Sequence, residues 1–178
     1  MNYGNTLVIN LIGGPCSGKS TIAAELFARL KKMGIKCELC TEFIKERIYD
    51  EHKFILTNQI YLFANALNQI LNKLNKVDVI IHDGSLLLNI CYDKDNNKQL
   101  HELVLAEYKK FNNLDFFLNR TNIKFENYGR IHNEDESNKI DLIIKNLYQK
   151  YNLDFIELDS KDCLDKIIKY ILEKINDK

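Results

Sequence analysis

Eight residues near the N-terminus, Gly13-Gly14-Pro15-Cys16-Ser17-Gly18-Lys19-Ser20, constrain the fold of this chain more than any other feature. They match the pattern G-x-x-x-x-G-K-[ST] and stand between an apolar run at 6–12 and an amphipathic segment at 19–33. Glycines let the backbone approach an anion closely, and successive N–H groups at the start of a helix attract phosphate. The pattern therefore predicts a strand, a phosphate-binding loop and a helix, in that order.

The same loop predicts how a nucleoside triphosphate is held, with ATP and Mg²⁺ as the expected ligands. Lys19 is expected to reach the β- and γ-phosphates, and Ser20 to bind Mg²⁺ through its hydroxyl group. The residues predicted to bind the nucleotide are consecutive in the chain: Gly13, Gly14, Pro15, Cys16, Ser17, Gly18, Lys19, Ser20 and Thr21.

Short apolar runs alternate with helical patterns along the whole chain. Strands are predicted at 6–12, 35–40, 77–81, 115–118 and 155–158. Helices are predicted at 19–33, 43–49, 58–76, 86–91, 100–110 and around 140–151, with a last helix capped by Ser160. This alternation predicts an α/β fold with a parallel sheet covered by helices on both faces. No linker or repeat interrupts it, so the 178 residues are expected to form one domain.

Two acidic residues follow predicted strands and are candidates for catalysis. Glu42 follows the second strand and Asp83 the third. Since parallel strands end at one edge of a sheet, Lys19, Glu42 and Asp83 are expected to lie at the same edge. Asp83 is predicted to hold Mg²⁺ through water, and either carboxylate could take the proton of a substrate hydroxyl. The structural alternatives are a turn at Asp83-Gly84 and a helix-start acid at Glu42.

Residues 121–133 are polar and lack periodicity, which predicts a mobile loop within a lid-like segment at about 120–135. Arg120 and Arg130 bracket this loop. Phosphoryl transfer develops negative charge that a mobile arginine can neutralise, and a closing lid also excludes water. Both arginines are therefore predicted to be catalytic, with solvated loop positions as the alternative.

Composition excludes several other classes of protein. The formal net charge is zero, which gives no support for non-specific nucleic-acid binding. No apolar run approaches the roughly 20 residues that span a bilayer, and residues 1–6 do not resemble a signal peptide, so a cytoplasmic protein is expected.

Cys37 and Cys40 form C-x-x-C on a predicted strand, where their side chains point to opposite faces and cannot share a metal or disulfide. His82, at a strand end, is expected either to pack in the core or to be a bystander.

Together these segments resemble the small P-loop kinases related to the ribosylnicotinamide kinase domain, and the phage-type AAA-like proteins grouped with them. The resemblance is carried by GGPCSGKST at 13–21, TEFIKE at 41–46, DGSLLL at 83–88, FFLNR at 116–120 and YGR at 128–130. It implies a three-layer, nucleotide-kinase-like fold whose five strands lie in the order 2-3-1-4-5. It also implies ATP as donor, a nucleoside- or nucleotide-like acceptor, and the roles already predicted for the acids and arginines.

The leading hypothesis is therefore a kinase acting on a nucleoside- or nucleotide-like small molecule. Two alternatives stay open: a kinase acting on a 5′-hydroxyl or modified base of nucleic acid, which the neutral charge does not favour, and a regulatory P-loop ATPase or switch. No membrane partner is expected, and the sequence allows a homodimer.

Overall fold

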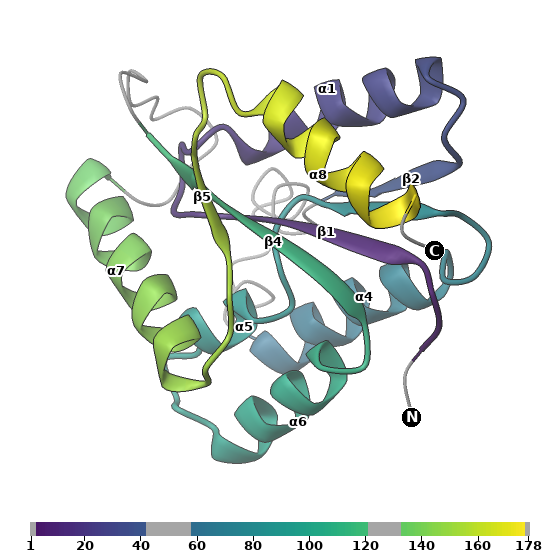
Figure 1. The fold of residues 1–178 in the computed structure, drawn as a ribbon. Helices are drawn as coiled ribbons and strands as arrows, with labels where there is room; N and C mark the ends of the chain where they lie inside the picture. The colour runs from purple at the N-terminus through teal and green to yellow at the C-terminus, as the bar shows by residue number, and fades with distance from the viewer. Residues whose placement is uncertain (1–2, 42–57, 121–132, 177–178) are drawn as a thin grey trace.

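The computed structural model describes residues 3–41, 58–120 and 133–176. These form three layers, with one sheet between two layers of helices (Figure 1). The strands are β1 (Leu7–Ile12), β2 (Cys37–Cys40), β3 (Val79–His82), β4 (Asn112–Asn119) and β5 (Ile156–Asp159). The helices are α1 (Lys19–Lys32), α4 (Gln59–Leu71), α5 (Leu88–Cys91), α6 (Lys98–Tyr108), α7 (Glu134–Lys150) and α8 (Leu164–Asn176). All four strand pairings are parallel, and the strand order is β2-β3-β1-β4-β5. The predicted fold class and strand order are confirmed.

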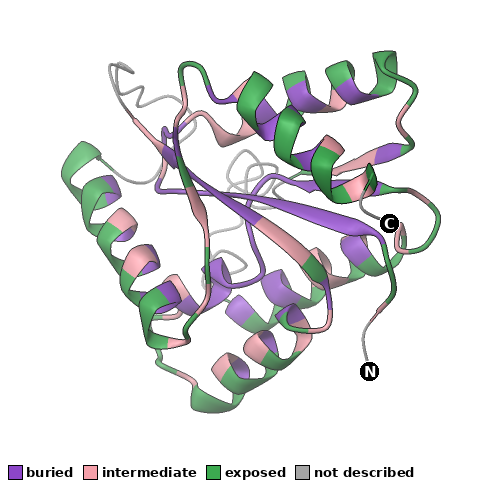
Figure 2. Cartoon of the chain, viewed as in Figure 1, coloured by how far each residue is buried: buried purple, intermediate pink, exposed green. Residues whose placement is uncertain are grey.

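The sheet separates two hydrophobic cores, because side chains alternate between its faces. Leu7, Ile9 and Leu11 of β1 join the core that α1 and α8 cover. Val8 and Ile12 join the core on the other face, under α4, α5, α6 and α7. Figure 2 shows the result, with the central strands of the sheet buried between helices whose outer faces are exposed.

The C-x-x-C cysteines follow the same rule. Cys37 belongs to the α1–α8 core and Cys40 to the opposite one. The two thiols therefore lie on opposite faces of β2, as predicted.

Three predicted boundaries were wrong for reasons of tertiary contact. The helix predicted to reach residue 76 ends at Leu71, because Asn75 takes a left-handed backbone (φ 60°) and its N–H donates to Oγ1 of Thr6. Ser160 does not cap α8, which begins at Leu164; its hydroxyl donates to the carbonyl of Asn119 instead. β4 is longer than predicted because polar residues before 115 pair with β1.

The helix predicted at 43–49 lies outside the described residues. Across the described ranges, no helix has both the length and the apolar character needed to cross a bilayer.

Candidate functional site

The phosphate loop joins β1 to α1 at the carboxyl-end edge of the sheet. Gly18 precedes the first helical residue, Lys19, with a φ of 84°, a conformation that side chains other than glycine rarely adopt. Ser17 is fully buried inside the loop. The glycine before the lysine is thus required by backbone geometry, which explains that part of the motif.

The ammonium group of Lys19 folds back over the loop. Its Nζ donates to the carbonyl oxygens of Gly13 at 2.7 Å and Gly14 at 2.9 Å, and lies 3.4 Å from Oγ of Ser17. These carbonyl groups hold the positive charge beside the loop, and the contact of Lys19 with the β- and γ-phosphates stays a prediction.

Helix α7 packs directly against the loop, a contact that the sequence did not predict. Oδ1 of Asp141 accepts a hydrogen bond from the backbone N–H of Gly14 at 2.6 Å, and Oγ of Ser137 donates to the carbonyl of Pro15 at 2.6 Å. A Cβ at Gly14 would lie 2.6 Å from the backbone oxygen of Ser137, which no real side chain could tolerate. Gly14 therefore lets α7 approach the loop closely.

Arg120, at the end of β4, completes this contact. Its guanidinium forms a largely buried ion pair with Asp141, donates to Oδ1 of Asn138 at 2.6 Å, and approaches the carbonyl of Pro15 at 3.4 Å. One predicted lid arginine is thus tied to both α7 and the phosphate loop. Arg130, the other, lies outside the described residues, as does Glu42.

Asp83 immediately follows β3, beside β1, and its backbone N–H donates to the carbonyl of Cys40 at 2.9 Å. The residue is only 4% exposed, and its Oδ1 is a buried oxygen without a hydrogen-bond partner among the described residues. Burying an unpaired carboxylate oxygen is costly, so such an atom points to a ligand. Carboxylate and hydroxyl oxygens suit Mg²⁺, and the site therefore fits the predicted ion through Asp83 and Ser20.

A pocket opens beside Asp83, between α4 and the segment from β3 to α5. Amide and hydroxyl side chains share its wall with apolar ones. The lining residues are Thr41, Gln59, Leu62, Ala66, Gln69, His82, Asp83, Gly84, Ser85, Leu88, Asn89 and Tyr92. Oγ of Ser85, which lines the pocket, also accepts a hydrogen bond from the backbone N–H of Leu87 at 3.3 Å.

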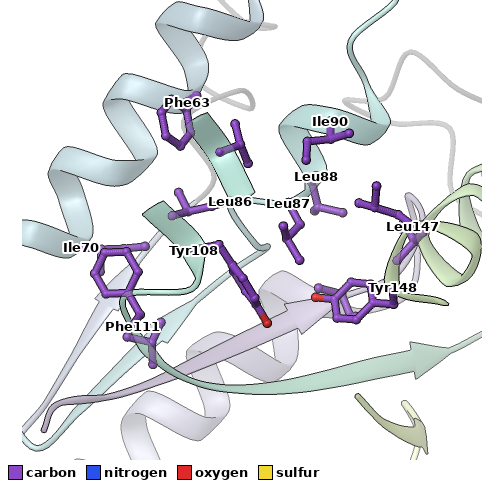
Figure 3. Packing of buried hydrophobic residues seen from close by; sticks show 14 of the residues in the cluster. Phe63, Ile70, Leu86, Leu87, Leu88, Ile90, Tyr108, Phe111, Leu147 and Tyr148 are labelled. Carbon is purple, nitrogen blue, oxygen red and sulfur yellow. The ribbon is translucent and has the colours of Figure 1, made fainter. Parts of the chain in front are cut away.

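A buried polar network lies on the same sheet face as this pocket. His82 contacts Asn10, Asn10 donates to Asp115, and the hydroxyl groups of Tyr108 and Tyr148 also donate to Asp115. The two tyrosine rings stand within the α4–α7 core (Figure 3). Burial raises the pKa of Asp115 to about 6, against the opposing effect of these hydrogen bonds, and lowers the pKa of His82 to about 4.

Sequence reasoning missed most of these supporting residues. His82 is buried, as the packing alternative predicted, and it also lines the pocket, which the sequence did not predict. Asn10 gave a signal that could have been used, since it is the polar residue of the otherwise apolar β1, and Asp115 directly precedes the apolar run of β4 at 116–118. Asp141 gave none, because an acid on an amphipathic helix is usually a solvent-exposed residue.

This loop, its following helix and the strand order define a P-loop nucleotide-binding protein with a kinase-like fold. The family model described as "AAA domain" matches residues 8–166, and the chain belongs to this family. The predicted resemblance to AAA-like P-loop proteins is thereby confirmed; the resemblance to ribosylnicotinamide kinase domains stays a prediction. A search of curated proteins finds no match.

Two solved structures share the fold over nearly the whole chain. Deoxyadenosine kinase from M. mycoides, with dCMP as product and a flexible dCDP bound, has a TM-score of 0.57 at 20% identity, covering 97% of this chain and 100% of that one. The YorR protein of Bacillus subtilis, in complex with phosphorylated GDP, has a TM-score of 0.59 at 20% identity, covering 96% of each chain. At this identity the likeness establishes the fold.

Proposed function

We propose that this protein transfers the γ-phosphoryl group of ATP to a hydroxyl or phosphate group of a nucleoside- or nucleotide-like small molecule. The observation that carries the proposal is Asp83: its buried, unpaired Oδ1 belongs to a residue that lines a pocket at the same sheet edge as the phosphate loop. The two fold neighbours, one a deoxyadenosine kinase and one bound to a phosphorylated nucleotide, support the same class of substrate.

The loop supplies the donor side of this reaction. Its backbone N–H groups and the start of α1 favour the phosphates, and Lys19 exchanges the carbonyl groups of Gly13 and Gly14 for phosphate oxygens. Mg²⁺, held by Ser20 and Asp83, would neutralise charge on the phosphates when bound. Arg120 stands at the loop wall, where it can add to that neutralisation.

The pocket supplies the acceptor side. A carboxylate, Asp83 or Glu42, takes the proton of the acceptor hydroxyl as its oxygen attacks the γ-phosphorus, and ADP leaves. For a phosphate acceptor no proton is removed, and the same carboxylates serve the metal or orient the substrate. The amide side chains of Gln59, Gln69 and Asn89 offer hydrogen bonds for orienting a polar molecule.

The test is an ATP-consumption assay with Mg²⁺ across nucleosides, deoxynucleosides, nucleotides, nicotinamide riboside and short oligonucleotides. We expect ADP formation that depends on one of the small acceptors, and its loss in Lys19→Ala with the fold retained by circular dichroism. Full activity of that variant would contradict the phosphate-loop mechanism. ADP formation that no acceptor changes would favour the regulatory ATPase alternative, and dependence on an oligonucleotide would favour the nucleic-acid kinase.

A further inference from the structure

His82 occupies a particular place in the pocket wall. It is the last residue of β3 and pairs in register with Asn10 of β1. Its Nδ1 lies 3.3 Å from Oδ1 of Asn10. Its Nε2 would lie 3.9 Å from a Cβ built on Gly84, which lines the same pocket. One ring nitrogen therefore faces the sheet, and the other is close to the pocket wall.

The orientation of the Asn10 side chain follows from its other neighbours. Its Nδ2 lies 2.6 Å from Oδ1 of Asp115 and 2.9 Å from Oδ1 of Asn113. Asn113 cannot be turned around, because its own Nδ2 donates to the carbonyl oxygens of Tyr108 at 2.7 Å and Phe111 at 3.3 Å. Asn10 must therefore donate to both neighbours with Nδ2, which leaves its Oδ1 for His82.

This orientation selects one form of the imidazole ring. The Oδ1 atom of Asn10 can only accept, so Nδ1 of His82 must carry a hydrogen to make the contact. In the neutral ring the other nitrogen, Nε2, then has a free electron pair and acts as an acceptor. Asp115 stabilises the arrangement, since the hydroxyl groups of Tyr108 and Tyr148 hold its carboxylate in place.

We infer that His82 is a specificity-determining residue of the acceptor pocket: its Nε2 accepts a hydrogen bond from a hydroxyl or amino group of the molecule that is phosphorylated. The inference rests on the proposed function and adds a recognition element to it. Asn10 and Asp115 act as positioning residues that keep Nε2 free of hydrogen. A site built to accept a hydrogen bond discriminates against molecules that lack the donor, because the buried acceptor is then left unpaired.

The first test is ¹⁵N NMR of the full chain with labelled histidine. Only four histidines are present, so comparison with a His82→Gln sample assigns the signals of interest. We expect the Nδ1–H form at His82 in the free protein. Its Nε2 signal should shift when adenosine, guanosine, cytidine or uridine, or a 2′-deoxy form, is added at saturating concentration. An Nε2–H form in the free protein would overturn the inference whatever the kinase assay shows.

The second test is kinetic and uses two variants of His82. His82→Asn keeps a donor for Asn10 but does not reach the pocket, whereas His82→Gln keeps an acceptor near the position of Nε2. We expect His82→Asn to raise KM for the nucleoside acceptor about ten-fold, with KM for ATP unchanged, and His82→Gln to restore part of the loss. An unchanged acceptor KM in His82→Asn would overturn the inference.

Analogues then separate the two sources of the donor. If His82→Asn no longer discriminates between adenosine and its 2′- or 3′-deoxy forms, the donor is that hydroxyl group. If it no longer discriminates between adenosine and purine riboside, the donor is the amino group. Phosphorylation of none of these nucleosides, with the Nδ1–H form present, would overturn the proposed nucleoside acceptor and the recognition role together, while leaving the ring geometry established.

Discussion

Replacing Asp83 with asparagine should separate activity from stability. The wild-type carboxylate is 4% exposed and has an Oδ1 atom without a partner among the described residues. An unsatisfied buried polar group costs about 1–3 kcal/mol, and more if it is charged. Asp83→Asn keeps the shape of the side chain but removes the charge. The ligand-free variant should therefore gain roughly 1–2 kcal/mol in its free energy of unfolding.

For a chain of 178 residues such a gain raises Tm by roughly 2–8 °C, from about 2–4 °C for each kcal/mol. The same substitution removes a predicted metal ligand and candidate base, so kcat should fall by about 10²–10⁴. Differential scanning calorimetry without ligand, and again with saturating ATP and Mg²⁺, measures the change in Tm, and steady-state kinetics measures the change in kcat. The wild type should gain more from ATP and Mg²⁺ than the variant does, because Asp83 finds its partner only in the complex.

Asp83→Glu is the matched control, since it keeps the charge and should not stabilise the free protein. A lower Tm for ligand-free Asp83→Asn, together with wild-type turnover, would refute the reasoning. It would mean that Asp83 is a structural turn residue whose carboxylate is satisfied in solution.

Three further predictions concern other parts of the site. Glu42→Gln should lower kcat more than it weakens ATP binding, as measured by steady-state kinetics and calorimetric titration; the reverse pattern would make Glu42 structural. Asp141→Ala should cost about 2–3 kcal/mol of unfolding free energy and weaken nucleotide binding, because Gly14 and Arg120 lose their shared acceptor; Asp141→Asn, which keeps an acceptor for Gly14, should lose less, and equal losses would contradict this reading. For Asp115, the folded pKa of about 6 lies above the unfolded 3.8, so protonation favours folding. Its contribution to the free energy of unfolding is full below about pH 4 and is lost as the pH rises through 6. Denaturant titrations at several pH values should show that Asp115→Asn removes up to about 3 kcal/mol of this pH dependence. An unchanged dependence of the unfolding free energy on pH would count against the raised pKa.

The phosphate loop could be predicted from the sequence because its requirements are local. Gly18 is needed for its backbone conformation, and Lys19 and Ser20 follow it on the first turn of α1. The alternation of strands and helices could also be predicted locally, since apolar residues recur along the chain with the period of the strand or helix that contains them. Asp83 was placed correctly at a strand end because parallel strands finish at one edge of the sheet.

The ends of the helices, and the contacts that support the site, could not be predicted from local sequence patterns. Oγ1 of Thr6 accepts a hydrogen bond from the backbone N–H of Asn75, and this contact ends α4. The hydroxyl of Ser160 donates to the carbonyl of Asn119 and therefore does not cap α8. These partners lie 69 and 41 residues apart in the chain, so no local pattern contains them.

The sequence by itself thus determined the phosphate loop, the alternation of elements and the apolar faces that bury them. Only the tertiary structure decided that Asp141 and Arg120 meet at the loop, and that Asn10 and Asp115 fix the ring of His82 at the pocket. The physical reason is that periodicity reports which face of an element is buried, whereas a hydrogen-bond partner depends on the packing of distant segments. A polar residue on a buried face shows that a partner is needed, but the fold selects which one it is.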